Sequence, residues 1–290
     1  MSVSRRMFLG AAASALAAQP QAQAFKPQLV LFSKHLPNLN YEDLAKTVKE
    51  FGFDGVDLTV RPKGHVLPER VAEDLPRAVD TLRKRGLTVP MITTEITSAT
   101  DPTAIPTLRT AASLGIPFFK PGYWRYGPGP VDPQVKSTGA EVHRLAMLAG
   151  EHKIAMGLHN HSGNYIGEAV WDAWAMIYDL DPRWTGFYYD PGHAAIEGGL
   201  GGHDVSLRLA LPRLKMVAVK DFFWRKEPAG WKSTWCPLGE GAVDWKSVMG
   251  PLRNASYNGP ISLHQEYTVP DMLGGLRKDL AFLRTAVESA

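Results

Sequence analysis

The feature that most constrains the fold of this chain is a regular alternation of strand-like and helix-like segments. Between residues 41 and 51, Leu44, Val48 and Phe51 recur at the spacing that places side chains on one face of a helix. The next segment, 55–60, is a short apolar run typical of a buried strand. The expected strands are 29–36, 55–60, 89–96, 117–124, 155–161, 186–190, 214–222 and 260–267, and the expected helices are 41–51, 67–85, 102–114, 133–152, 168–180, 204–210, 245–253 and 272–287.

Eight strand-then-helix units predict an α/β fold of the closed (β/α)8, or TIM barrel, type. Residues 25–290 match the roughly 250 residues typical of one such barrel, so we expect a single domain. A doubly wound parallel sheet is the alternative, because it also alternates strands with helices. Against it, no Gly-x-Gly-x-x-Gly motif follows the strand expected at 29–36.

Residues 1–24 predict an export signal rather than a part of the fold. Arg5 and Arg6 form a twin-arginine pair, an apolar run follows at 11–18, and residues 22–24, Ala-Gln-Ala, fit a signal peptidase site. The alternative is a chance arginine pair before a short apolar anchor, but the run is well short of the roughly 20 residues that span a bilayer. We therefore expect a Tat-exported, periplasmic protein.

The charge balance limits the classes of partner. The net charge is +3, and two of those charges belong to Arg5 and Arg6 in the predicted signal. A nearly neutral mature protein lacks the basic surface that nucleic acid or an anionic membrane would require. We expect neither a nucleic-acid partner nor membrane insertion, and the sequence is compatible with a homo-oligomer.

Polar residues at the ends of the expected strands are the candidate site residues, because a TIM barrel carries its chemistry where strands end and βα loops begin. Side chains two residues apart on a strand share a face, so His159 points with His161, and His264 with Glu266. The polar strand ends are Lys34 and His35, Arg61 and His65, Thr93 to Glu95, Lys120, His159 to His161, Asp190 and His193, Lys220 and Asp221, and His264 to Glu266.

Acidic side chains and histidines that converge on one mouth suit a divalent cation: Mn or Mg with more oxygen ligands, Zn or Co with more histidine. Such an ion polarises a carbonyl, and a carboxylate or lysine then removes the neighbouring proton. Each group also has a structural alternative. These are a tight turn at 190–193, satisfied core histidines at 159 and 161, an ion pair at Glu266, and solvated or salt-bridged lysines at 120 and 220.

Five motifs follow one another at the strand ends: Gly157-Leu158-His159-Asn160-His161, Asp190-Pro191-Gly192-His193-Ala194, Val219-Lys220-Asp221, Leu238-Gly239-Glu240-Gly241 and Ile261-Ser262-Leu263-His264-Gln265-Glu266. Their order and spacing resemble those of the xylose-isomerase-like TIM barrels, a sugar (phosphate) isomerase/epimerase family that includes inosose isomerases and dehydratases and ketose 3-epimerases. The resemblance spans essentially the whole of 25–290. It implies a sugar isomerase or epimerase, and therefore a small-molecule carbohydrate substrate.

The resemblance also implies a metal site with one departure. In the metal-dependent epimerases of the group, the ligands are Glu, Asp, His and Glu from four successive strands. Asp190 and Glu266 match two of these, His159 stands at the position of the first glutamate, and Ala218 stands at the position of the histidine. The implied metal ligands are therefore His159, Asp190 and Glu266, with a fourth ligand from His161, from His193 or from water. If the metal site is degraded, a lysine takes over as base or forms a Schiff base.

The leading hypothesis is proton transfer next to the carbonyl of a ketose, keto-sugar or cyclitol, assisted by a divalent metal ion. The expected catalytic residues are Glu266, Lys220 and His193. A lyase or hydrolase acting on keto-glycosides or inososes is an alternative, because it shares the first step. A non-catalytic periplasmic sugar-binding barrel is another, supported by Ala218. The expected substrate-binding residues are Arg61, His65, Glu95, Lys120, His161 and Trp124.

Overall fold

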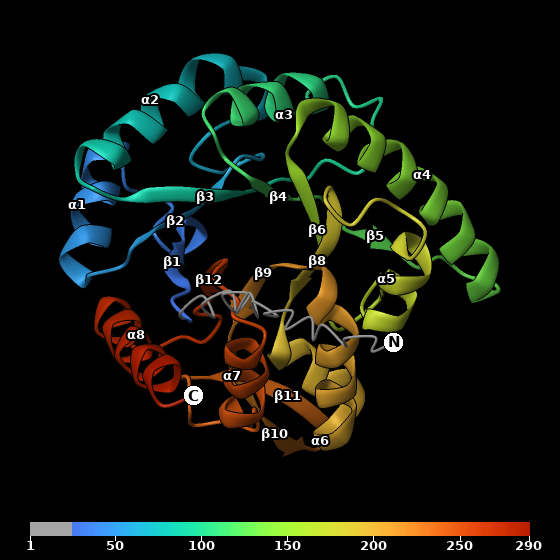
Figure 1. The fold of residues 1–290 in the computed structure, drawn as a ribbon. Coiled ribbons are helices and arrows are strands. Elements are labelled where there is room, and N and C mark those ends of the chain that lie inside the picture. The colour runs from blue at the N-terminus through green and yellow to red at the C-terminus, as the bar shows by residue number, and fades with distance from the viewer. Residues whose placement is uncertain (1–24) are drawn as a thin grey trace, which may run out of the picture.

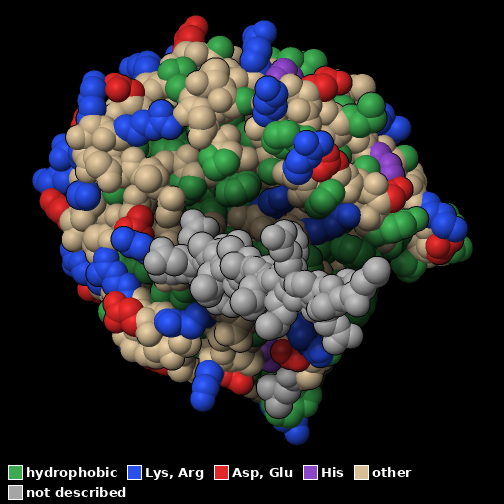
Figure 2. All heavy atoms as spheres, in the orientation of Figure 1, with side chains coloured by type: hydrophobic (Ala, Val, Ile, Leu, Met, Phe, Trp, Pro, Cys, Tyr) green, Lys and Arg blue, Asp and Glu red, His purple; other side chains and the backbone are tan. Residues whose placement is uncertain are grey.

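The computed structural model describes residues 25–290, and the export signal predicted at 1–24 lies outside the described residues. Within the described part, none of the helices is both long and apolar enough to span a bilayer. Basic and acidic side chains are interspersed over the face seen in Figure 2, which accords with the small net charge.

Eight strands form a closed barrel in the order β1-β12-β9-β8-β6-β4-β3-β2, and each neighbouring pair is parallel. The barrel occupies the centre of Figure 1. Its strands are β1 (Gln28–Phe32), β2 (Gly55–Thr59), β3 (Thr88–Thr93), β4 (Phe118–Lys120), β6 (Ala155–His159), β8 (Thr185–Tyr189), β9 (Leu214–Val219) and β12 (Pro260–Leu263). The TIM barrel predicted from the sequence is confirmed.

Eight helices surround the barrel (Figure 1). The first begins where Asn40 accepts a hydrogen bond from the Asp43 backbone N–H, and it ends at Gly52, whose φ is 89°. The helices are α1 (Tyr41–Phe51), α2 (Val71–Lys84), α3 (Ala104–Ser113), α4 (Val131–His152), α5 (Val170–Ile177), α6 (Pro191–Ala210), α7 (Trp245–Asn254) and α8 (Met272–Glu288), with short 3-10 turns at Ser33–His35, Pro68–Arg70 and Leu211–Arg213.

Several elements differ from the sequence prediction. The strands expected at 29–36, 117–124 and 260–267 end earlier, at Phe32, Lys120 and Leu263. The strand expected at 214–222 stops at Val219, and a separate hairpin of β10 (Asp221–Glu227) and β11 (Gly230–Cys236) follows. A smaller pair, β5 (Trp124–Arg125) and β7 (Tyr165–Ile166), spans two loops. The segment Pro191–Ala210 consists of two helical stretches that meet at Gly199, whose backbone is not helical, and the helix expected at 204–210 lies in the second. The first stretch, which was not predicted, begins at Pro191 because Asp190 caps it and proline suits a first helical position.

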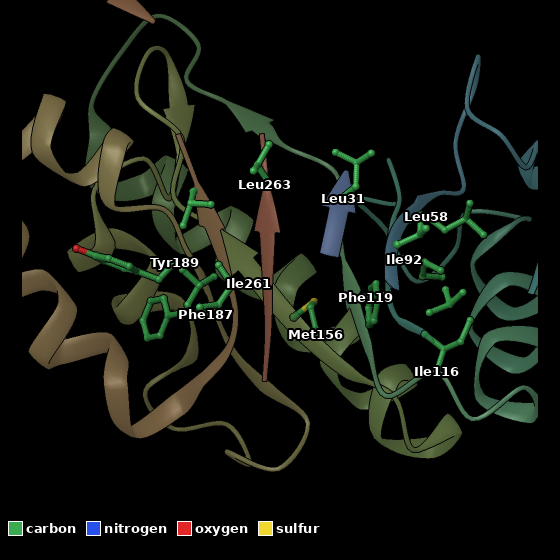
Figure 3. Packing of buried hydrophobic residues seen from close by; sticks show 14 of the residues in the cluster. Leu31, Leu58, Ile92, Ile116, Phe119, Met156, Phe187, Tyr189, Ile261 and Leu263 are labelled. Atoms are coloured by element: carbon green, nitrogen blue, oxygen red, sulfur yellow. The ribbon is translucent and has the colours of Figure 1, made fainter. Parts of the chain in front are cut away.

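Side chains alternate along the barrel strands between the barrel interior and the layer of helices. Met91, Tyr188, Met216 and Ala218 form a small buried cluster of their own, made by β3, β8 and β9. The positions further along these strands are polar, so the cluster is an apolar floor beneath the mouth of the barrel. The outward-facing strand residues belong to the main core, shown in part in Figure 3, and include Leu31, Leu58, Ile92, Phe119, Phe187 and Ile261.

Gly186, in β8, is expected to be poorly replaceable even by alanine. A Cβ at this position would lie 1.8 Å from the backbone oxygen of Arg213, so backbone must move. We expect Gly186→Ala to lower the free energy of unfolding by about 2 kcal/mol or more in urea denaturation. Gly139→Ala in α4 is the matched control: its Cβ would meet only ordinary contacts from 3.7 Å, and it should be neutral or stabilising. Equal effects would contradict the prediction.

Candidate active site

A pocket opens at the C-terminal mouth of the barrel, where the polar strand ends were expected to meet. Residues at or just after the ends of seven of the eight barrel strands line it, together with Tyr188, the fourth residue of β8. The lining residues are Phe32, Lys34, Arg61, Thr93, Lys120, Tyr123, His159, His161, Tyr188, Lys220, His264 and Glu266.

Six of the predicted site residues line this pocket: Arg61, Lys120, His159, His161, Lys220 and Glu266. Two more, Asp190 and His193, contact Lys220 and are almost completely buried. The structure therefore brings all the predicted catalytic and metal-binding residues to one end of the barrel.

Three of the predicted substrate-binding residues do not line the pocket. Both ring nitrogens of His65 bond within the protein, Nδ1 with Thr59 Oγ1 and Nε2 with the Leu36 carbonyl, so this ring holds the loop after β2. Glu95 is exposed and pairs with Arg61 at 3.6 Å. Trp124 lies in β5, paired with β7.

Six lining residues had been given no catalytic, substrate-binding or metal-binding role from the sequence: Phe32, Lys34, Thr93, Tyr123, Tyr188 and His264. Lys34, Thr93 and His264 are among the polar strand ends identified in the sequence, and Tyr123 stands beside one, so the sequence carried a signal for them. Phe32 and Tyr188 are ordinary strand residues by type, and only the closed barrel shows that they face the pocket.

Asp190 organises the deepest part of the site. Its Oδ1 accepts the backbone N–H of His193 at 3.0 Å, which caps the first turn of α6. The Asn160 side chain bonds to both the backbone N–H and the carbonyl of Asp190, at 2.8 and 3.0 Å, and thus fixes β6 to the end of β8. Because Oδ1 is used by the cap, Oδ2 remains for the site.

Two N–H donors, the ammonium of Lys220 and the ring of His159, lie within reach of Asp190 Oδ2. Lys220 Nζ lies 3.2 Å and His159 Nε2 lies 3.2 Å from Asp190 Oδ2. The Tyr123 hydroxyl lies 2.6 Å from His159 Nδ1. With the proton on Nε2, the neutral His159 ring donates to Asp190 and accepts from Tyr123, so both of its nitrogens are engaged.

The same chain of hydrogen bonds continues on the other side of Lys220. Its Nζ donates to His193 Nε2 at 2.8 Å, and His193 Nδ1 lies 2.8 Å from Ser162 Oγ. His193 therefore carries its proton on Nδ1 and is neutral. Trp235, from β11, lies edge-on to His193 and presents its ring to Lys220 Nζ at 5.1 Å.

The imidazoles of the site are held neutral. Burial lowers the pKa of His159 to about 3 and that of His161 to about 4. Burial, and then the charge of Lys220, keeps the pKa values of His193 and His264 well below the ordinary range. Neutral imidazoles can accept hydrogen bonds from a ligand. In His161, Nδ1 bonds to the Ser162 carbonyl, and Nε2 has no hydrogen-bond partner among residues 25–290, so it can accept one.

Lys120 differs from Lys220 because its amine has no hydrogen-bond acceptor among residues 25–290. Its Nζ makes no hydrogen bond or ion pair within the described part of the chain and lies 3.3 Å from the centre of the Tyr123 ring. Burial, and then the charge of Arg61, holds the pKa of this amine well below its usual value. A buried amine that faces a cavity without a partner is suited to bind an oxygen of a ligand.

Beneath the pocket, a buried carboxyl anchors a second polar network. Asp57 accepts hydrogen bonds from Thr93, Ser262 and Tyr188, at 2.7, 3.0 and 3.1 Å. The Tyr188 hydroxyl also lies 2.9 Å from His264 Nε2. Burial raises the pKa of Asp57 to about 6, despite these donors. The network fixes the orientation of Tyr188 and His264, which line the pocket.

Glu266 is the accessible carboxylate of the pocket. Burial alone would raise its pKa, but the charges of Lys220 and Lys34 outweigh that effect and hold the pKa below its ordinary value. Lys34 Nζ lies 3.1 Å from both carboxylate oxygens, in a pair whose lysine is 43% exposed. Such an exposed pair is weak, so a ligand can displace Lys34 and reach an ionised carboxylate.

The donor set does not fit the metal site that the sequence implied. Among residues 25–290, no group of three or more His, Cys, Asp or Glu side chains is arranged to hold a metal ion. His159 and Asp190 do meet, but their facing atoms bond to each other, and Ala218 offers no donor. The position beside Asp190 Oδ2 is filled by the ammonium of Lys220.

Comparison with known proteins identifies the family. The family described as xylose isomerase-like TIM barrel matches residues 45–286. The chain belongs to this family, as its strand-end motifs indicated.

Individual relatives are distant. Inosose dehydratase from Bacillus velezensis is 26% identical over 136 residues, which cover 43% of this chain and 45% of the dehydratase, so the match spans less than half of that relative. The structure of 3-keto-D-glucoside 4-epimerase from E. coli has a TM-score of 0.71 at 17% identity, covering 90% of this chain and 100% of that chain. A xylose isomerase-like TIM barrel protein from Mycobacterium smegmatis, in complex with magnesium, has a TM-score of 0.69 at 18% identity, covering 90% and 97%.

Proposed function

We propose that this protein is an enzyme of the sugar isomerase and epimerase kind. It moves a proton at the carbon beside the carbonyl of a ketose, a keto-sugar or a cyclitol. The observation that carries the proposal is the juxtaposition, in one pocket, of an ionised carboxylate with lysine amines and neutral imidazoles. Glu266 serves as the base, and the lysines bind the oxygen on which negative charge develops.

The other lining residues suit a polyol. Arg61 and Lys120 donate hydrogen bonds to hydroxyl or carbonyl oxygens, and His161 accepts one from a hydroxyl group. The rings of Phe32 and Tyr123 provide apolar faces against which the C–H groups of a sugar pack. This combination of hydrogen-bonding groups and apolar ring faces suits a polyol substrate, and screening will identify which one.

Incubation with a panel of ketoses, keto-sugars and inososes in D2O tests the proposal. We expect deuterium incorporation at the carbon beside the carbonyl, measured by NMR, and we expect Glu266→Gln to reduce the exchange rate at least about 100-fold because the base is lost. The control is Glu73→Gln on the exposed surface of α2, which should exchange as the wild type does. Absence of exchange across the panel, with or without added divalent metal, would leave the non-catalytic sugar-binding barrel as the better hypothesis.

A lyase reaction is the second candidate, favoured by the stretch of similarity to an inosose dehydratase. Removal of the same proton followed by loss of a β-hydroxyl group as water would use the same base. Product mass separates the two: an isomer keeps the mass of the substrate, and elimination of water lowers it.

We further propose that Tat export places this activity in the periplasm, as Arg5 and Arg6 suggest. Fractionation of cells producing the full chain, with Arg5→Lys/Arg6→Lys as the retained control, tests the location.

A further inference from the structure

Lys220 occupies a position in the site where Asp190 holds its cation. Its Nζ lies between Asp190 Oδ2 and His193 Nε2, at 3.2 and 2.8 Å, and its side chain is 3% exposed. An ammonium group has three N–H donors. Two have these partners, and Lys220 also lines the pocket, so the third N–H remains for a ligand.

The surrounding groups are arranged for a positive charge at that place. Asp190 supplies one full negative charge with 0% side-chain exposure, and His193 turns an unprotonated nitrogen toward the ammonium. Trp235 covers it at 5.1 Å, a distance at which an aromatic ring attracts a cation. Ala218, on the same face of β9 two residues earlier, carries no donor that could hold a metal ion instead.

We propose that the ammonium of Lys220 takes the place of a divalent metal ion in this enzyme and binds the carbonyl oxygen of the substrate. The proposal rests on the proposed function. When Glu266 takes the proton from the adjacent carbon, the C–H electron pair becomes the new carbon–carbon double bond and the carbonyl pair moves to oxygen. That oxygen then carries the negative charge, beside the third N–H of Lys220. The proton on Glu266 exchanges with solvent, and transfer of the solvent-derived proton from Glu266 to the carbon restores the carbonyl and completes the exchange.

A binding experiment tests the position of the cation without reference to activity. In Lys220→Ala the carboxylate of Asp190 and the ring nitrogen of His193 lose their cation, so we expect Co²⁺ to bind at least about tenfold more tightly than to the wild type, measured by calorimetry and by visible absorption of bound Co²⁺. Lys120→Ala is the matched control, because it removes a lysine from the same pocket but leaves Asp190 paired. Equal gains in the two variants, or wild-type binding as tight as that of Lys220→Ala, would overturn the proposal.

Deuterium exchange into the substrate provides a second test of the role of Lys220. Wild-type exchange should be unchanged by EDTA, Lys220→Met should lose at least about 100-fold, and Lys220→Arg, which keeps the charge, should retain more than Lys220→Met. Exchange that EDTA abolishes and Mn²⁺ restores would overturn the role of Lys220. If the wild type exchanges no substrate, the proposed function fails, whereas the Co²⁺ titration still decides whether Lys220 fills a cation site.

Discussion

Replacing Asp221 by asparagine should lower the free energy of unfolding by about 3 kcal/mol or more, measured by urea denaturation. The reason is that this buried carboxylate accepts four hydrogen bonds. Its Oδ1 receives the backbone N–H groups of Phe222 and Val243, at 2.9 and 3.2 Å, and its Oδ2 receives the Gly239 N–H and Trp245 Nε1, at 3.0 and 2.9 Å. An amide of the same shape would turn its own N–H groups toward two of these donors.

The matched control for Asp221 is another aspartate of the same segment. Asp244 caps α7 by accepting from the backbone N–H groups of Lys246 and Ser247, and these bonds are exposed. Asparagine is about as good a cap as aspartate, so Asp244→Asn should change stability by only a few tenths of a kcal/mol. A loss below about 1 kcal/mol for Asp221→Asn would show that the loop after β9 does not depend on this carboxylate.

The effect of Asp221 also bears on the site. The four hydrogen bonds fix the start of the β10–β11 hairpin, which carries Trp235, and they fix the residue next to Lys220. The Val219-Lys220-Asp221 and Leu238-Gly239-Glu240-Gly241 motifs thus meet in one structure: Gly239 donates to Asp221, and a Cβ on Gly241 would lie 2.1 Å from Asp221 Oδ1. Sequence could place the two motifs in order but not in contact.

The parts of the fold that the sequence predicted are those set by local periodicity. The helix at Tyr41–Phe51 has the predicted bounds, because its apolar spacing, its Asn40 cap and the glycine that ends it are all adjacent in the chain. The β10–β11 hairpin escaped prediction because its strands are largely exposed, so they lack a regular apolar alternation. The first helical stretch of α6, from Pro191 to the kink at Gly199, escaped prediction because glycines interrupt its helical spacing, and Gly199 itself has a φ of 60°.

For the site, the sequence identified which strand ends carry chemistry but not the partners of each side chain. His65 and His159 are both histidines at strand ends, yet His65 bonds to a carbonyl from another segment and His159 faces the pocket. The metal ligands implied by the sequence could not be tested without the fold, for the same reason. The sequence shows alanine at 218 and lysine at 220, but the contact of Lys220 Nζ with Asp190 arises only because β9 and β8 are neighbouring strands.

The ion pair of Lys220 with Asp190 leads to the prediction with the largest effects on both stability and catalysis. Asp190→Asn should cost about 3–5 kcal/mol of unfolding free energy, because it leaves the ammonium of Lys220 buried without its counter-charge. The pKa of Asp190 agrees with a strong interaction: burial would raise it, but the charge of Lys220, together with the hydrogen bond from His159, holds it well below its ordinary value. The Asp190→Asn substitution should also abolish exchange, because the ammonium loses the group that positions it.

Removing both charges should restore stability without restoring function. In Asp190→Asn/Lys220→Met no unpaired charge remains buried, so we expect the double variant to be more stable than Asp190→Asn, with a coupling free energy of about 2–3 kcal/mol in a double-mutant cycle measured by urea denaturation. Exchange should remain absent, since the group that binds the carbonyl oxygen is gone. Additivity of the two single substitutions within about 0.5 kcal/mol would mean that the pair does not act as a unit. Recovery of exchange in the double variant would instead place the positive charge needed for catalysis on another cation of the pocket, which Lys34, Arg61 and Lys120 also line.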